Sequence, residues 1–96
     1  MVGGFLYITT NKNHTTLYVG VTSDLRGRII KHRLKKYQRS FSSRYNVTKL
    51  VYFEIFPTIA EAIAREKQLK AGSRKQKINL ITRMNPEWRD LHEMLN

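Results

Sequence analysis

The stretches GFLYITT at residues 4–10 and TLYVGVT at residues 16–22 decide the fold of this chain. Each is a short run of β-branched, aromatic and aliphatic residues, which favours a β-strand. The polar stretch NKNHT at residues 11–15 lies between them and predicts a hairpin loop. Two strands joined in this way are expected to pair antiparallel.

The alternation of side chains within these strands separates the aliphatic residues from two tyrosines. Leu6 and Ile8 share one face of the first strand, and Tyr7 lies on the other. Tyr18 likewise falls opposite the aliphatic residues of its strand. One such tyrosine is usually a packing residue with a solvated hydroxyl. Gly20 lies on the same face as Tyr18, however, and its missing side chain predicts open space beside the tyrosines.

A helix and a third strand are predicted next. The helix is expected to begin near Leu25, with Ser23 or Asp24 as its cap, and to end near residues 37–40. The sequence KLVYFEIF at residues 49–56 is the strongest strand pattern in the chain. Its apolar residues on both faces predict a strand that does not lie at an exposed edge of the sheet.

Three further helices are indicated by their boundary residues. The segment Thr58–Glu61 fits a capping box, and Gly72 is placed to end the helix that it opens. A second capping box at Ser73–Gln76 opens another helix. Asn85 and Pro86 are a typical start for a final amphipathic helix.

This order of elements, ββαβααα, predicts an α+β fold with a small antiparallel sheet of about three strands flanked by helices. The chain has 96 residues, which is room for one hydrophobic core. We therefore expect residues 1–96 to form a single domain.

The charge of the chain indicates a polyanionic partner. Lys and Arg number 18 against 7 Asp and Glu, a formal net charge of +11. Nine basic residues and no acid lie between Leu25 and Phe53, and a second basic cluster between Arg65 and Lys77 encloses the single acid Glu66. A single residue of this kind usually belongs to a solvated face, but the whole set favours phosphate binding. The expected nucleic-acid contacts are Arg26, Lys31, Arg33, Lys35, Lys36, Arg44, Lys67, Lys70, Arg74 and Lys75.

Membrane insertion and thiol chemistry are disfavoured. No apolar run approaches the ~18 residues of a spanning helix, and the start of the chain lacks a signal-peptide pattern. The absence of cysteine excludes disulfides, Cys-ligated zinc and a thiol nucleophile. The protein is therefore expected to be cytoplasmic.

Glu66 is the residue that helix periodicity does not explain. It lies three residues after Ile63 and three before Leu69, on or beside the apolar stripe of its helix. A carboxylate there is costly unless it is paired or binds a cation. It is thus either a boundary glutamate paired with a nearby Lys or Arg, or a metal ligand or catalytic carboxylate.

Taken in order, these residues resemble the GIY-YIG nuclease superfamily. The resemblance is carried by Phe5-Leu-Tyr7, by Tyr18-Val-Gly20, by Arg28 and His32 one helical turn apart, and by a later helix with Glu66. More narrowly, the chain is similar to the small stand-alone bacterial group, which is distantly similar to the N-terminal nuclease domain of the bacterial excinuclease. Two departures are Phe5 in place of the first Gly and Val21 where the excinuclease-like branch tends to have Lys.

The resemblance implies hydrolysis of phosphodiester bonds at a single divalent ion, Mg²⁺ or Mn²⁺, bound by Glu66. One of Tyr7 and Tyr18 would accept the proton of the attacking water while the other orients it, and Tyr7 is the favoured base. Arg28 would contact the scissile phosphate, and His32 would position the water or donate to the phosphate.

The expected function is therefore a metal-dependent DNA endonuclease. The alternative is a non-catalytic nucleic-acid-binding module with the same fold and basic surface, and a protein that binds anionic lipid is a third, less favoured class. Branched, flap or damaged DNA, or RNA, all stay open as substrates.

Overall fold

The structure is a computed structural model that describes residues 3–33 and 47–95, without the side chains of residues 32 and 33. It confirms the predicted α+β fold and the three antiparallel strands. The predicted end of the first helix, near residues 37–40, lies outside the described residues.

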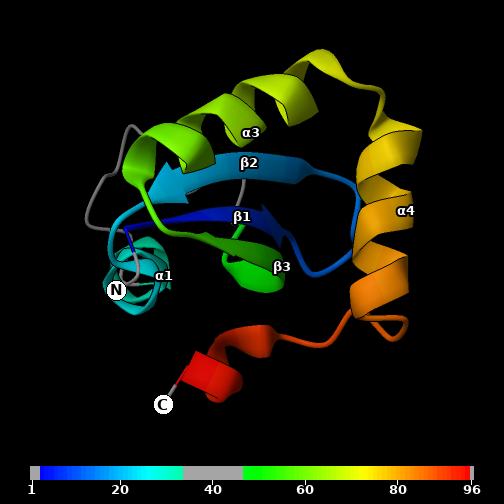
Figure 1. Cartoon of the computed structure of the whole chain (residues 1–96). Helices are drawn as coiled ribbons and strands as arrows, with labels where there is room; N and C mark the ends of the chain where they lie inside the picture. Colours follow the sequence, from blue (N-terminus) through cyan, green and yellow to red (C-terminus); the bar gives the residue numbers. More distant parts are fainter. Residues whose placement is uncertain (1–2, 34–46, 96) are drawn as a thin grey trace.

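Three strands form one antiparallel sheet: β1 (Gly4–Thr10), β2 (Leu17–Thr22) and β3 (Lys49–Phe56). The strand order is β2-β1-β3, so the first strand of the chain is the central one (Figure 1). The hairpin loop between β1 and β2 is closed by Asn11, whose Oδ1 accepts hydrogen bonds from the backbone N–H groups of Thr15 and Thr16. The predicted hairpin is therefore confirmed.

β3 is an edge strand of the sheet, but part of its edge is covered, which agrees with the prediction that residues 49–56 do not form an exposed edge. The segment after the last α-helix covers this edge: Asn85 Nδ2 donates to the carbonyl of Val51 at 3.1 Å, and the N–H of Leu50 donates to Asp90 Oδ1 at 3.3 Å. Backbone groups that would face solvent at an open edge are thus bonded within the chain.

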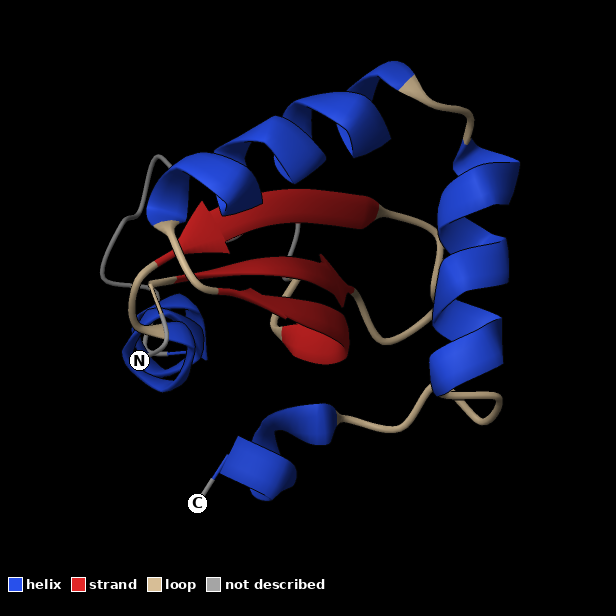
Figure 2. Ribbon diagram, viewed as in Figure 1, coloured by secondary structure: helices blue, strands red, loops and turns tan. Residues whose placement is uncertain are grey.

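The helices lie on the two faces of the sheet: α1 (Leu25–Arg33), α3 (Ile59–Ala71), α4 (Arg74–Met84) and the 3₁₀-helix η1 (Leu91–Leu95). Figures 1 and 2 show α3 over one face, with α1 and η1 on the opposite side. In residues 3–33 and 47–95, no helix has the length and apolar character needed to cross a membrane.

Two apolar clusters correspond to the two faces of the sheet. Leu6, Ile8 and Val19 pack with Leu69 of α3 and Ile81 of α4. On the other face, Tyr7 packs with Leu25 and Ile29 of α1, with Leu50 of β3 and with Leu91 of η1. The predicted alternation in the first two strands is confirmed, since Tyr7 lies on the face opposite Leu6 and Ile8.

The predicted capping box is complete in α4, and in α3 the structure shows the half that Thr58 supplies. Thr58 Oγ1 accepts a hydrogen bond from the N–H of Glu61, and Ser73 and Gln76 form a reciprocal capping box. Gly72 ends α3 in an extended conformation with φ −83°, not a left-handed one. A Cβ on Gly72 would lie 2.2 Å from Gln76 Oε1, so the side chain that caps α4 is what requires glycine there.

The predicted final α-helix is wrong. Asn85 ends α4 instead of starting a new helix, since its N–H donates to the carbonyl of Ile81 at 2.7 Å. Its side chain then donates to the carbonyl of Arg89 and accepts from the N–H of Arg89. Trp88 takes a left-handed backbone conformation, φ 54°, and its ring stacks on His14 with centroids 4.8 Å apart. These contacts replace helical hydrogen bonds, and only η1 forms further along the chain.

Candidate active site

Tyr7 and Tyr18 lie side by side on the face of the sheet that α1 covers. Their ring centroids are 6.2 Å apart with an interplanar angle of 45°, and the Tyr7 hydroxyl is hydrogen-bonded with Tyr18. Tyr7 is 1% exposed, whereas Tyr18 is half-buried. Only the second phenol is therefore partly open to solvent.

Gly20 makes this arrangement of the rings possible. It lies directly opposite Tyr7 in the register of β1 and β2. A Cβ at Gly20 would lie 2.5 Å from both Cζ and Oη of Tyr7 and 2.9 Å from a ring carbon of Tyr18. The Tyr7 ring thus extends across β2 over the position where any other residue would place a side chain.

Arg28 reaches the tyrosines from α1, whose start is fixed by a local hydrogen-bond network. Asp24 Oδ1 accepts a hydrogen bond from the N–H of Gly27 at 3.1 Å, and the Asp24 carbonyl accepts from the N–H of Arg28 at 3.0 Å. Thr22 Oγ1 accepts from the N–H of Asp24 at 3.1 Å and so joins the end of β2 to this cap. Of the two predicted caps, Ser23 and Asp24, the structure thus shows Asp24 in this role.

Glu66 reaches the tyrosines from α3. Ala62 and Leu69 form the buried stripe of that helix, and Glu66 lies beside it with a side chain 18% exposed. Its carboxylate is 3.4 Å from Nζ of Lys70. The Lys70 side chain is 53% exposed, so Glu66 is paired with a solvent-accessible cation, as the alternative of a boundary glutamate expects. The partly buried carboxylate still keeps oxygen lone pairs for a bound cation.

The pKa of Tyr7 responds to Tyr18, Arg28 and Glu66, so these three residues lie within electrostatic range of its phenol. We refer to the four residues as the tyrosine cluster. Burial raises the pKa of Tyr7 well above the ordinary value of 10.0, and an ionised Tyr18 beside it raises the pKa further. The positive charge of Arg28 acts in the opposite direction. The negative charge of Glu66 and the hydrogen bond with Tyr18 also favour the protonated phenol. Residues from β1, β2, α1 and α3 thus interact at one place.

The structure tests the location of the remaining predicted site residues only in part. His32 lies on α1 one turn after Arg28, but its side chain and that of Arg33 are not among the described ones. Lys35, Lys36 and Arg44 also lie outside the described residues. The other predicted nucleic-acid contacts have exposed side chains on three helices: Arg26 and Lys31 on α1, Lys67 and Lys70 on α3, and Arg74 and Lys75 on α4.

A single hard cation fits the donor set around Glu66. No group of three His, Asp or Glu side chains within the described ranges could enclose a metal ion. Mg²⁺ does not need such an enclosing group, because in proteins it keeps several waters and binds one or two carboxylates together with substrate phosphates. Glu66 is a half-buried oxygen donor next to two phenols, which suits such an ion.

Two supporting residues were not singled out as part of the site from the sequence. Thr22 tethers the cap of α1 and thereby the helix that carries Arg28. Lys70 was predicted as a nucleic-acid contact, and the structure pairs it with Glu66. The spacing of four residues between Glu66 and Lys70 is the signal that indicates this pair.

Comparison with known proteins identifies the class. Residues 3–79 match the GIY-YIG catalytic domain, so the chain belongs to the GIY-YIG family, which is a family of nucleases. These residues include Tyr7, Tyr18, Arg28 and Glu66. GIY-YIG nucleases generally depend on a divalent metal ion.

Within this family, the chain is similar to small proteins of the UPF0213 group. It is 38% identical over 78 residues to the UPF0213 protein of Staphylococcus saprophyticus, a match that covers 81% of this chain and 93% of the relative. It is 35% identical over 72 residues to that of Syntrophus aciditrophicus, covering 75% and 82%. The solution NMR structure of a UPF0213 protein from Bacillus halodurans is 28% identical, with a TM-score of 0.57 over 94% of this chain and 93% of the other. The expected small stand-alone group is confirmed.

Proposed function

We propose that the protein is a metal-dependent endonuclease that hydrolyses phosphodiester bonds in DNA. The observation that carries this proposal is that Tyr18, Arg28 and Glu66, from three other elements, all act electrostatically on the buried Tyr7 phenol. Apolar packing alone does not favour two hydrogen-bonded phenols within electrostatic range of a guanidinium and a half-buried carboxylate.

Each residue of this cluster has a role in the proposed reaction. Glu66 would hold one Mg²⁺ or Mn²⁺ ion, which when bound supplies Lewis-acid stabilisation of negative charge on the phosphate. Arg28 presents a planar guanidinium, the group best suited to pair with phosphate oxygens and to stabilise charge in the transition state. The phenols orient the attacking water and accept its proton.

Burial limits which phenol can accept a proton. A buried, neutral Tyr7 is a poor base at neutral pH, because its pKa lies above the ordinary value. The positive charge of Arg28 counteracts this shift in the pKa of Tyr7, whereas the hydrogen bond with Tyr18 adds to it. The role of base therefore belongs to one member of a coupled pair, and kinetics of the separate variants assign it.

The exposed basic residues support DNA as the substrate. They lie on α1, α3 and α4, and Figure 1 shows α1 and α3 on opposite sides of β2, the strand that carries Tyr18. Positive charge on two sides of a reaction centre is what a phosphate backbone passing through it requires.

The test is cleavage of plasmid DNA by Glu66→Gln in Mg²⁺ or Mn²⁺. This change keeps the shape of the side chain and removes the charge that binds the ion. We expect nicking to be lost while DNA binding and the unfolding transition are kept. Glu61→Gln is the matched control, because it removes the same charge from an exposed position of the same helix and is expected to cleave like the parent.

Two other outcomes would contradict this proposal. Equal cleavage by the parent and Glu66→Gln would remove this residue from the site. DNA binding without cleavage by the parent, with either ion and on nicked, flap and branched substrates, would favour the non-catalytic binding module.

A further inference from the structure

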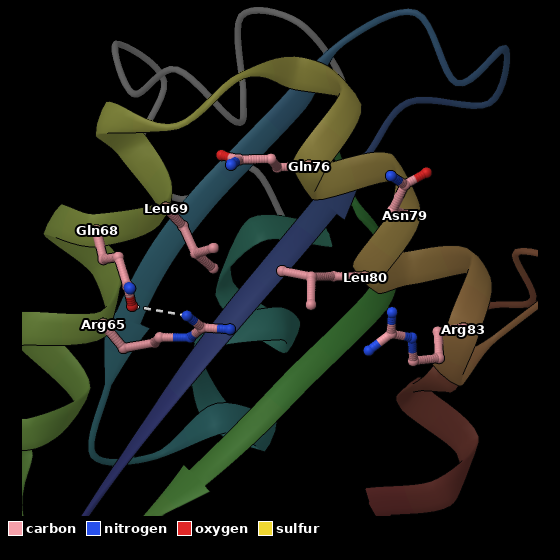
Figure 3. Close-up of a pocket in the computed structure, with 7 residues that line it drawn as sticks. All are labelled: Arg65, Gln68, Leu69, Gln76, Asn79, Leu80 and Arg83. Carbon is pink, nitrogen blue, oxygen red and sulfur yellow. Dashed lines mark hydrogen bonds between the residues drawn. The ribbon is translucent and has the colours of Figure 1, made fainter.

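A groove between α3 and α4 lies away from the tyrosine cluster. It has a volume of about 310 Å³ and is floored by Leu69 and Leu80. Its rim carries only polar or basic side chains among the described residues, which Figure 3 shows projecting from both helices: Arg65, Gln68, Gln76, Asn79 and Arg83. The catalytic proposal uses none of them.

The acceptor atoms of two rim amides are already occupied. Gln76 Oε1 accepts a hydrogen bond from the N–H of Ser73 at 3.1 Å. Gln68 Oε1 accepts from Nη1 of Arg65 at 2.6 Å (Figure 3). Each amide therefore keeps its NH₂ group for a ligand, so both side chains can donate hydrogen bonds toward the groove.

The charge of the groove is positive. Arg65 is neutralised by Glu54, with Nε 3.0 Å from Oε1 and Nη2 3.1 Å from Oε2. Arg83 is exposed and forms no ion pair within the described residues. No carboxylate is among the described residues that line the groove. The net positive charge of the groove thus comes from the guanidinium of Arg83. The amides of Gln68, Gln76 and Asn79 line the same groove.

A compact anion with several acceptor oxygens fits this lining. We propose that the groove binds a phosphate group through Arg83, Gln68, Gln76 and Asn79. A guanidinium pairs with two phosphate oxygens at once, and the amide NH₂ groups reach the others. A carboxylate ligand offers only two oxygens and leaves donors unused.

The position of the groove relates it to the reaction centre. Successive residues of a helix are rotated by about 100°, so Arg65 and Glu66 lie on opposite sides of the buried stripe of α3. A backbone that crosses α3 therefore meets the reaction centre on one side and the groove on the other. The inference that DNA supplies this phosphate rests on the proposed function, whereas the inference that the groove binds free phosphate does not.

The first experiment follows the side-chain amide NMR signals of Gln68, Gln76 and Asn79 without divalent ions. Inorganic phosphate and a short DNA duplex are titrated separately, with chloride at the same ionic strength as reference. We expect saturable shifts with DNA that Arg83→Gln abolishes. Shifts with phosphate alone, also lost in Arg83→Gln, would support the site with free phosphate as its ligand. No shift with either titrant overturns the proposal.

The second experiment compares the DNA affinity of two variants with equal charge loss. Arg83→Gln is expected to weaken binding about tenfold and to reduce the slope of log affinity against log salt by about 1. Arg89→Gln removes the same charge from a side chain that is 75% exposed and paired with Glu87, and is expected to bind within about twofold of the parent. Equal weakening by both variants would show an effect of net charge only and would overturn the site.

These measurements are independent of cleavage. If the nuclease proposal fails, the phosphate titration still decides whether the groove binds an anion. If Glu66→Gln abolishes cleavage while Arg83→Gln binds and cleaves DNA like the parent, DNA is rejected as the source of the phosphate, and the phosphate titration decides whether the groove is an anion site.

Discussion

The tyrosine pair shows how one missing side chain organises a site. Without a Cβ at Gly20, the Tyr7 ring extends across β2 and brings its hydroxyl to Tyr18. The same burial that fixes the ring raises the pKa of Tyr7 and keeps its hydroxyl protonated. A phenol that is well positioned but poorly ionised needs compensating positive charge, which Arg28 supplies in part.

At this scale, we predict that Tyr7→Phe and Tyr18→Phe each fold and bind DNA but cleave more slowly. Loss of a general base typically lowers the rate by ~10²–10⁴, while removal of an orienting hydroxyl costs less. Single-turnover cleavage at saturating protein and metal ion measures both variants, and the larger deficit identifies the base. If both variants cleave at the parental rate, the tyrosine mechanism is wrong even for a nuclease.

Alkaline stability provides a control for the burial of Tyr7. The pKa of Tyr7 is higher in the folded protein than the unfolded value of 10.0. The contribution of the protonated phenol to the free energy of unfolding is therefore fully present below about pH 10 and is lost as the pH rises further. The Tyr7→Phe variant should therefore lose less stability than the parent above pH 10. Burial also raises the pKa of Tyr52, to about 12, so part of the alkaline loss persists in that variant.

The sequence indicates Glu66, Tyr7 and Tyr18 as site residues because each departs from the local pattern of apolar residues. Glu66 stood beside an apolar stripe, and Tyr7 and Tyr18 stood on the face opposite the aliphatic residues. Their approach to Arg28 and to one another depends on strand register and helix docking, which are long-range. In the sequence alone, only the family resemblance connects the four residues.

Among the elements, α1 positions Arg28 through a cap of two hydrogen bonds. We predict that Asp24→Ala destabilises the protein by about 1 kcal/mol, because the N–H of Gly27 loses its acceptor. Cleavage at saturating protein should also slow, since the first turn of α1 carries the guanidinium. Thermal or urea unfolding and single-turnover kinetics measure the two effects.

Ser23→Ala is the matched control for this cap. Ser23 is exposed and adjacent to Asp24, and it is expected to change stability by less than about 0.5 kcal/mol. A larger loss of stability from Ser23→Ala than from Asp24→Ala would show that Ser23, and not Asp24, caps α1.

Capping signals predicted α3 and α4 well, because a cap is a contact within three or four residues. Thr58, Ser73 and Gln76 all act as the sequence indicated. The failure involves Asn85, which ends α4 and donates to the carbonyl of Val51 in β3, 34 residues away. A local pattern cannot distinguish such a tertiary bond from the start of a helix, so it missed the non-helical segment. The apolar pattern of residues 49–56 likewise indicates an edge that is not exposed, but not which segment covers it.

For the whole molecule, a net charge of +11 on 96 residues is the dominant property. Compact folding of such a chain costs free energy through self-repulsion, and a polyanion removes that cost on binding. Each Lys or Arg that neutralises a phosphate also releases a counterion from the DNA, so affinity depends on salt.

We predict that DNA binding without divalent ions is similar for unrelated sequences and weakens steeply with salt. If six to ten phosphates are contacted, affinity should fall by roughly 10³ to 10⁵ between about 50 and 200 mM salt. Fluorescence anisotropy with two duplexes of unrelated sequence measures both properties, and the slope counts the contacts. Since only part of the basic set lies on α1, α3 and α4 in the described residues, a slope near the upper limit would indicate contacts from the rest of the basic residues as well. Affinity that does not change with salt would contradict a phosphate-binding surface altogether.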